Sequence, residues 1–318
     1  MALFKSTLVA AAFVLPAATP AQEVFPAKPI RFISCCQGYT EVTARLIAAE
    51  IQERYKQAVV VETKPGANGI IATDFVAKST ADGYTVLIGT NSTHAANQSL
   101  YAKLPYDYIK DFTPVSGISQ GMLLWVVDAN LPAKTAAEVT AMAKKEPGKL
   151  TFGAASSSAR AGMELYKMIS GADITYVPYK TNPQVVTDIL GGRVDMMFND
   201  AGSLLPHVQS GRLRAMAVSG TARSAALPDV PTMQEAGVPG YALTFWHGAW
   251  VPAGTPKDVV GKLGEMFRHA LATPKVRDHI TNALATPMPL GSEELLKFTM
   301  DEEQKWRKIA VGAQMKAE

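Results

Sequence analysis

Cysteine is almost absent from this chain. Its 318 residues include two cysteines, Cys35 and Cys36, and these are neighbours. This pattern excludes a framework of disulfides between distant residues. A disulfide between neighbours is strained, because disulfide-linked residues usually have Cα atoms farther apart than adjacent residues do. We expect both cysteines to pack as small, weakly polar side chains at the inner end of a strand.

Long apolar runs are also missing. The run Leu8–Leu15 is too short to span a bilayer, and no later stretch of about 18 apolar residues follows it. Lys5 precedes this run and small residues follow it at 17–21, a pattern typical of a cleaved secretory signal. No cysteine stands at the cleavage position, so we expect no lipid anchor. We expect residues 1–21 to be removed and the mature protein to be exported and soluble.

Several motifs that would define a function are lacking. The formal net charge is +3 and the basic residues are scattered, so we expect no nucleic-acid partner. The five histidines form no His-Glu-x-x-His motif and no pair spaced by four residues, so we expect no metal. A P-loop and a Gly-x-Gly-x-x-Gly motif are missing too, and we expect no nucleotide or other cofactor.

One motif of hydrolytic enzymes does occur. Gly117–Gly121 matches the Gly-x-Ser-x-Gly pattern of a nucleophile elbow, with Ser119 at its centre. That elbow needs a strand before the serine and a helix directly after it. The following residues, Met122–Val127, are apolar and rich in strand formers, which indicates a buried strand. A secreted serine hydrolase using Ser119 is therefore a disfavoured alternative.

Short apolar runs alternate with longer amphipathic segments along the chain. This succession predicts an α/β fold with mostly parallel sheets, flanking helices and a ligand cleft between two lobes. Crossovers near residues 122 and 245 would place 22–122 and 246–318 in lobe 1 and 123–245 in lobe 2. The predicted strands are 30–34, 58–62, 84–89, 122–127, 150–152, 174–178, 194–199 and 213–219. The predicted helices are 41–55, 70–77, 139–145, 163–170, 185–190 and 257–271, with another from Pro274 and a terminal one at 293–311.

Polar loops follow three of the predicted strands. Open α/β sheets bind ligands at the carboxyl ends of their strands, and free N–H groups at helix N-termini suit a carboxylate. Arg160 can also grip a carboxylate with two hydrogen bonds. The loops supply the candidate binding residues Gln37, Gly38, Tyr39, Thr40 and Glu41; Thr90, Asn91, Ser92 and His94; and Ser156, Ser157, Ser158 and Arg160.

Each candidate also has a simpler explanation. Thr40 and the serines could be N-caps that stabilise their helices by about 1 kcal/mol each. Arg160 could be an exposed residue of a first helical turn, although a cation there opposes the helix dipole. Tyr39 is equally explained as a lid over the ligand or as a contact between the lobes. Trp246 is expected in the core. Lys180 or Asn182 could help Arg160 to hold a second carboxylate. Asn199 and Asp200, at the end of a predicted strand, could line the cleft or the hinge, or could equally be cap residues.

Many segments resemble one known family. They include KPIRFI, GYTEVTARLIA, VVVETKPGANGIIATDFVAKSTADGYTVLIGT, LYAKLPYDYIKDFTPV, VPYK, DILGGRVDMMFND, LPHVQSGRLRAMAVSGTARSAALPDVPTMQEAGVPGY and WVPAGTPKDVV. In this order they resemble the receptors of tripartite tricarboxylate transporters, also called Bug proteins. The resemblance covers nearly the whole mature chain. It implies a monomeric periplasmic solute-binding protein, not an enzyme, whose two lobes close on a small organic acid and deliver it to a membrane permease.

Two loops depart from the family pattern. The first usually contains prolines and ends in Gly-Gly-x-x-Asp, whereas here Cys35 and Cys36 occupy part of that stretch. Gln37 replaces one glycine and Glu41 replaces the aspartate. In the third loop, serines at 156–158 replace a Gly-x-Gly-Ser run, and Arg160 stands at the place of a histidine. Arg160 and Tyr39 would suit a ligand with two carboxylates on a flat ring. A receptor that hands its closed form to a signalling partner instead of a permease is an open alternative.

Overall fold

The computed structural model describes residues 25–312 and Met315. The predicted signal, residues 1–21, lies outside these residues. The chain begins with β1 (Ile30–Ser34), α1 (Tyr39–Tyr55), β2 (Val59–Thr63), the 3-10 turn η1 (Ala67–Gly69), α2 (Ile70–Ala77), β3 (Thr85–Thr90), the π-helical turn η2 (Ser92–Ala96) and α3 (Asn97–Leu100). β1 lies between β2 and β3 and is parallel to both.

A second group of elements follows the long strand β4 (Phe112–Asp128). It contains α4 (Ala136–Lys145), β5 (Thr151–Ala154), α5 (Ser157–Ser170), β6 (Thr175–Pro178), α6 (Asn182–Leu190), β7 (Met196–Asp200), α7 (Ala201–Gln209) and β8 (Leu213–Val218). β5 is parallel to both β6 and β7. The chain then returns through β9 (Thr244–Pro252) to α8 (Lys257–Ala272), α9 (Pro274–Asn282), β10 (Ala285–Pro287) and α10 (Ser292–Gly312).

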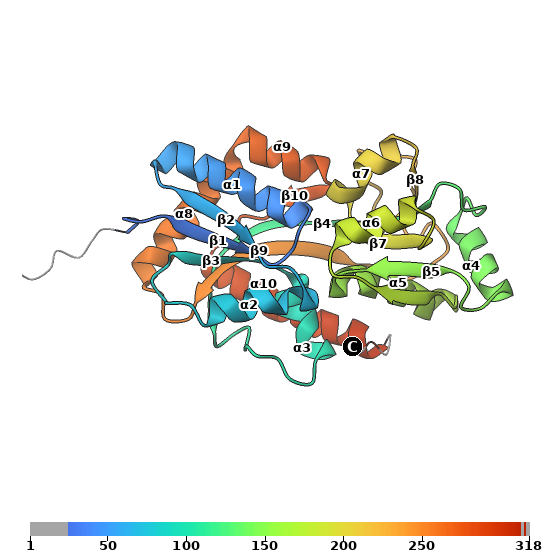
Figure 1. The fold of residues 1–318 in the computed structure, drawn as a ribbon, viewed down its shortest axis with the longest axis horizontal. Helices are drawn as coiled ribbons and strands as arrows, with labels where there is room; N and C mark the ends of the chain where they lie inside the picture. The colour runs from blue at the N-terminus through green and yellow to red at the C-terminus, as the bar shows by residue number, and fades with distance from the viewer. Residues whose placement is uncertain (1–24, 313–314, 316–318) are drawn as a thin grey trace, which may run out of the picture.

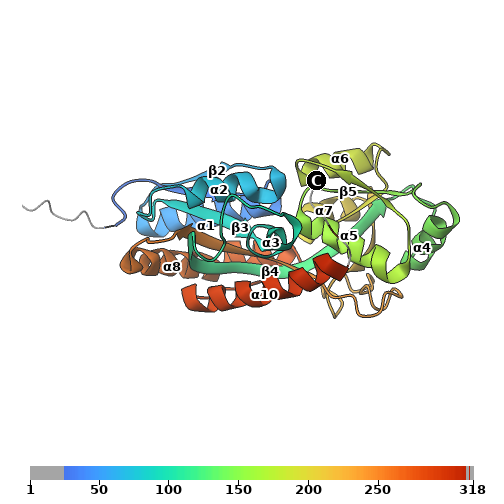
Figure 2. The ribbon, with the colours of Figure 1, turned by 90° about the horizontal axis from the view of Figure 1, so that it is seen from below.

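The helices lie on both faces of the sheet. In Figure 1, α1 and α9 lie above the strands of the first group, and α2, α3 and α10 lie below them. Figure 2 shows α10 running along β4 toward the second group, where it also contacts α5. Within the described residues, none of the helices combines the length and the apolar character that crossing a membrane requires.

Two long strands join the halves of the molecule. β4 pairs with β9 along Phe112–Met122 and then with β7 and β8 along 123–128, always antiparallel. The predicted α/β fold with two lobes is confirmed, and the parallel strands within each lobe are linked through these antiparallel pairs. We propose the lobe division at 122/123 and 245/246, and the change of partners along β4 supports it.

The core is built on apolar strands and tryptophans. Every residue of β3 is buried, as expected for a strand covered by helices on both faces. Trp246 is 0% exposed, so its prediction as a core residue is confirmed. Its indole Nε1–H donates a hydrogen bond of 2.9 Å to Oε2 of Glu302, a buried carboxylate on α10. This bond ties the terminal helix to β9.

Ser119 lies within the long strand β4, which continues as a strand on both sides of it. The helix that a nucleophile elbow requires is therefore missing at this position. The neighbouring Gly121 has a packing reason, because a Cβ there would lie 2.7 Å from Cζ of Phe245 and 2.7 Å from Cβ of Ala285. The glycine allows β9 and β10 to approach β4 closely, which explains this part of the motif without catalysis.

Helices begin earlier than the apolar periodicity predicts. α1 begins at Tyr39 rather than at 41, α5 at Ser157 rather than at 163, and α6 at Asn182 rather than at 185. The residues of their first turns are mostly polar or small, so these turns lack the apolar residues spaced by three and four positions from which a helix is predicted. As a result, several candidate binding residues belong to first helical turns rather than to loops.

We predict that Glu302→Ala destabilises the protein by about 1–3 kcal/mol, because the buried indole N–H of Trp246 loses its acceptor. Asp301→Ala, at the preceding and exposed position of α10, is the matched control and should change the stability much less. Urea unfolding of the two variants measures the difference. Equal stability of both variants would show that the bond does not hold α10 in place.

Candidate functional site

A small cavity lies between the lobes, where β1, β3, β5 and β7 end. Its volume is about 30 Å³. Its wall is mostly polar and comes from the segments after these strands, from the start of α6, and from β4 and β9. The residues that line it are Cys36, Gln37, Thr40, Thr90, Asn91, Ser92, Leu123, Ser156, Ser158, Asn182, Asn199, Asp200, Phe245 and His247.

Helix N-termini from both lobes meet at this cavity. Helices leave their first N–H groups without an internal acceptor, and their dipoles place partial positive charge there. Ser156 caps α5 by accepting a hydrogen bond from the backbone N of Ala159 at 3.3 Å. α1 begins after Gly38 and has no side-chain cap. The first-turn N–H groups of α1 are therefore available to an anion.

Buried polar atoms around the cavity lack protein partners. Among the described residues these include Nδ2 of Asn91, Oγ of Ser92 and Nδ2 of Asn199. The Asn199 carbonyl Oδ1 is already used, because it accepts a hydrogen bond of 3.0 Å from Nδ2 of Asn182. A buried donor without an acceptor costs free energy unless a ligand or water satisfies it. All three groups can donate to an acceptor such as a carboxylate, whereas Oδ1 of Asn182, in the same wall and also without a partner, can only accept.

A chain of hydrogen bonds, Thr40–His247–Ser119, begins in the cavity wall, where Thr40 and His247 both line the cavity. Nε2 of His247 is 3.0 Å from Oγ1 of Thr40, and its Nδ1 is 3.2 Å from Oγ of Ser119. Burial lowers the pKa of His247 to about 3, so the imidazole is neutral and carries one N–H. If that proton is on Nε2, Nε2–H donates a hydrogen bond to Oγ1 of Thr40, and the O–H of Thr40 is then free to donate to another acceptor. The tautomer of His247 thereby determines whether Thr40 can donate toward the cavity.

Asp200 is the acidic group in the cavity wall. Its Oδ1 caps α7 by accepting hydrogen bonds from N and Oγ of Ser203, at 3.0 and 2.8 Å. Burial raises the pKa of this carboxyl and so favours its neutral form. No lysine or arginine of the described chain lines the cavity, so an anion here would be held by neutral donors and helix dipoles. Among the described residues, no group of three or more His, Cys, Asp or Glu could hold a metal ion.

Tyr39 lies behind the cavity wall rather than over the cavity. Its buried ring stacks on His279 of α9, with ring centres 5.1 Å apart, and meets Phe245 edge-on at 5.8 Å. Its Cδ2 lies 2.7 Å from the position that a Cβ of Gly202 in α7 would occupy. Of the two explanations given from the sequence, the geometry favours a contact between the lobes over a lid.

Arg160 does not line this cavity. Its guanidinium lies over the ring of Tyr176, 4.5 Å from the ring centre, and its Nε is 3.8 Å from Glu164 Oε1. Because Arg160 is on the first turn of α5, its long side chain extends along the helix toward the next acidic residue on the same face. Its role as a carboxylate clamp stays a prediction.

Other candidates also lie outside the cavity wall. Glu41 forms an ion pair of 2.7 Å with Arg45, one turn further along α1. His94 is fully buried and stacks on Trp250 at 3.8 Å, and burial lowers its pKa to about 3. Oγ of Ser157 donates a hydrogen bond of 3.0 Å to Oδ1 of Asn97. Gly38 precedes α1 and lines a separate, more apolar cavity beside Tyr39.

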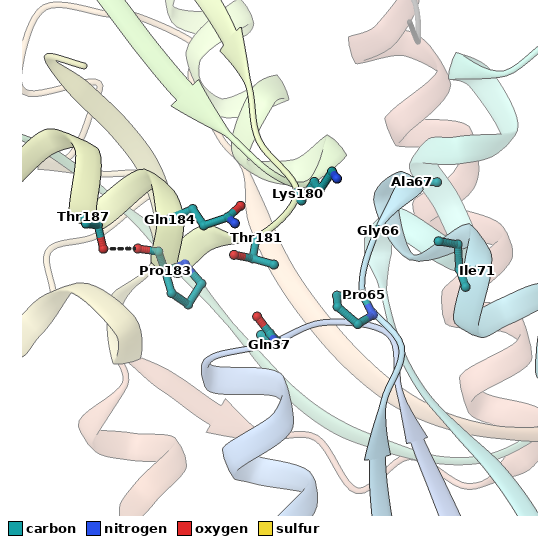
Figure 3. Close-up of a pocket in the computed structure, with 10 residues that line it drawn as sticks. All are labelled: Gln37, Pro65, Gly66, Ala67, Ile71, Lys180, Thr181, Pro183, Gln184 and Thr187. Atoms are coloured by element: carbon teal, nitrogen blue, oxygen red, sulfur yellow. Dashed lines mark hydrogen bonds between the residues drawn. The ribbon is translucent and has the colours of Figure 1, made fainter. Parts of the chain in front are cut away.

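Lys180 lines a larger cavity of about 720 Å³ that shares Gln37 with the small one. Figure 3 shows Lys180 and Gln184 of the second lobe on one side of this space and Pro65 and Ala67 of the first lobe on the other. Gln37 therefore belongs to the walls of both cavities.

Four residues of the cavity wall were missed by the sequence analysis as ligand contacts: Cys36, Leu123, Phe245 and His247. Leu123 and Phe245 look like ordinary strand residues. His247 comes from β9, a strand that the analysis did not predict, and Thr90 and Ser119 are its neighbours across the sheet. The pairing of β9 with β3 and β4 places His247 beside the loops that line the cavity. Cys36 could have been included among the candidates from the sequence, because it directly precedes the predicted loop that starts at Gln37.

A family model covers most of the chain. Residues 43–314 match the family described as "Tripartite tricarboxylate transporter family receptor". The chain belongs to this family of receptors. It is a family of solute-binding proteins and not of enzymes. Protein BugT of Bordetella pertussis is 34% identical to this chain over 307 residues, which cover 94% of each protein.

Solved structures of similar proteins include ligand complexes. An R. palustris protein with adipate is 32% identical, covers 92% of this chain and 99% of its own, and superposes with a TM-score of 0.89. MatC from Rhodopseudomonas palustris with bound malate is 29% identical, covers 90% of this chain and 99% of its own, and has a TM-score of 0.84. Both ligands are dicarboxylates.

We predict that His247 makes the stability depend on pH. Its pKa falls from 6.5 in the unfolded chain to about 3 in the folded protein, so the unfolded state binds more protons between these values. Stability should therefore fall as the pH drops below 6.5, by at most about 1.4 kcal/mol per pH unit for this group.

His247→Gln should reduce this pH slope, because the other titrating groups are shared with the wild type. Denaturant unfolding of both proteins between pH 4 and 7 tests this expectation. The slopes of unfolding free energy against pH should differ by at most the value for one proton taken up on unfolding. Identical slopes for the two proteins would contradict the buried, neutral state of His247.

Proposed function

We propose that this protein is a periplasmic receptor that captures a small organic carboxylate between its lobes and delivers it to a tripartite-type membrane permease. The observation that carries the proposal is the set of buried donors without partners, at a cavity where helix N-termini converge. Family membership and the adipate and malate complexes of relatives support it. We further propose that the mature protein is an exported monomer.

One carboxylate would be held in the small cavity. The hydroxyls of Thr40, Ser92 and Ser158, together with first-turn N–H groups of α1, are its proposed donors. Asn91 and Asn199 would contribute their free amide N–H groups. These donors come from both lobes, so the ligand would link the lobes and stabilise the closed arrangement.

A second carboxylate would lie in the larger cavity. Lys180 lines this larger cavity, and Gln37 lines both cavities. We therefore propose that Lys180 attracts the second charge of a dicarboxylate. The structure supports Lys180 for this role better than Arg160, because the guanidinium of Arg160 contacts Tyr176 and Glu164.

Calorimetric titration of the mature protein tests the proposal. The panel pairs each dicarboxylate with a similar molecule that carries fewer charges: adipate with hexanoate, malate with a neutral diol, and benzene dicarboxylate with benzoate. Binding of at least one carboxylate, and no binding of the neutral molecule, is the expected result. If no carboxylate on the panel binds, the donor set does not serve as a carboxylate site.

We predict that Ser158→Ala weakens carboxylate binding by about tenfold to a hundredfold, because a hydrogen bond to a charged group contributes about 1.5–3 kcal/mol. Ser157→Ala is the matched control. The two serines are neighbours on α5, but Ser157 bonds to Asn97 and does not line the cavity. Titration of both variants with the tightest ligand measures the effect, and equal losses would count against the assigned cavity.

We predict that Lys180→Met weakens adipate binding by about fivefold and leaves hexanoate binding nearly unchanged, because an exposed ion pair contributes up to about 1 kcal/mol. Arg160→Met also removes one positive charge, at a residue that does not line the small cavity. It should change the affinities for adipate and hexanoate by the same factor. A selective loss of adipate binding in Arg160→Met, but not in Lys180→Met, would instead support the arginine clamp predicted from the sequence.

A further inference from the structure

The two cysteines lie directly at the proposed carboxylate site. Cys36 is partly exposed and lines the small cavity, whereas Cys35 is buried with 1% of its surface exposed. Their sulfur atoms are 3.0 Å apart. A disulfide has an S–S distance of about 2.0 Å, so the thiols need to approach by only about 1 Å to bond.

The backbone of Cys35 is held by the sheet, whereas that of Cys36 is held by a side-chain hydroxyl. The N–H of Cys35 donates to O of Ile88 in β3, at 3.2 Å, which holds Cys35 in the sheet. Cys36 is the first residue outside this ladder, and its carbonyl accepts a hydrogen bond of 2.8 Å from Oγ of Ser34. Bond formation would therefore displace Cys36 rather than Cys35. Gln37 and Thr40 follow directly and line the same cavity.

We propose that Cys35 and Cys36 form a reversible vicinal disulfide that switches the carboxylate site between a binding and a weakly binding state. The inference rests on the proposed function for its compartment and its ligand. Disulfides persist in the periplasm, and this one joins neighbours, so it is strained and easily reduced. An external dithiol would reduce it back to the two thiols by the reverse exchange and would itself become a disulfide, so the bond would act as a labile switch and not as a structural crosslink.

The chemistry needs an oxidised disulfide as co-reactant, either a small disulfide or a disulfide of another protein. The Cys36 thiolate attacks one sulfur of that disulfide, releases one thiol and forms a mixed disulfide. The Cys35 thiolate then attacks the sulfur of Cys36 and expels the second thiol. Two protein thiols are oxidised, one external disulfide is reduced to two thiols, and the two thiol protons leave with them or with solvent.

Cys36 is the first nucleophile for two reasons. It is the exposed member of the pair, and a hydrogen bond with Cys36 together with burial raises the pKa of the Cys35 thiol. Because each attack needs a thiolate, oxidation should be faster at higher pH.

The first experiment follows the covalent change alone. The reduced mature protein is incubated with oxidised glutathione and analysed by intact mass and by iodoacetamide labelling. We expect the loss of two hydrogens, no retained glutathione, no labelled thiol, and full reversal by dithiothreitol. Cys35→Ser should instead keep one glutathione on Cys36, and Cys36→Ser should react far more slowly. A stable glutathione adduct on the wild type, or a disulfide between two chains, would overturn the proposal.

The second experiment measures adipate binding in both redox states. Oxidation should weaken adipate binding by about tenfold or more, and the double variant Cys35→Ser/Cys36→Ser should bind equally with and without oxidant. Equal affinity of the oxidised and reduced wild type would remove the switch even if the disulfide forms. If neither state binds adipate but other carboxylates of the panel bind, the best of them replaces it. If none binds, the proposed function fails, while the mass measurement still decides whether the disulfide exists.

Discussion

The structure depends on β4, the strand that runs through both lobes. β4 and β9 pair with each other in the first lobe, and β4 continues as the partner of β7 and β8 in the second. In this arrangement the segments that follow β1, β3, β5 and β7 all line the small cavity. The helices that follow these strands begin around this cavity. Their N-termini therefore place partial positive charge next to it.

The electrostatics of the cavity explain how an anion could be bound without a paired cation. A buried ion pair carries a large desolvation cost, whereas prearranged N–H and O–H groups need little reorganisation. Asp200 would oppose an anion if charged, but burial favours its neutral form and its Oδ1 already caps α7. The neutral His247 similarly adds hydrogen bonding without charge. Lys180 lies farther out, in the larger cavity, where a cation remains hydrated.

Sequence reasoning was most effective for local features. The strand-to-helix segments at 37–41, 90–94 and 156–160 could be found because glycine, hydroxyl and amide residues interrupt apolar runs there. Which side chains face the cavity could not be found in this way. Ser157 and Ser158 are chemically identical neighbours, and only the rotation of α5 separates the one that bonds Asn97 from the one that lines the cavity.

Long-range pairing accounts for the other differences. His247 lies 128 residues from Ser119 and 207 from Thr40, and no local pattern indicates that one imidazole contacts both. The direction of Arg160 depends on Tyr176 from a neighbouring strand and on Glu164 one turn further along α5. Tyr39 is fixed by α7 and α9, whose helices pack from distant parts of the chain. Such contacts follow from the tertiary fold and not from residue spacing.

The most direct test of the account is a crystal structure of the mature protein grown with adipate. The account predicts one carboxylate within hydrogen-bond distance of Thr40, Ser92 and Ser158, with the second directed past Gln37 toward Lys180. Adipate bound elsewhere, for example in the apolar cavity beside Tyr39 and His279, would contradict the assignment of the carboxylate site.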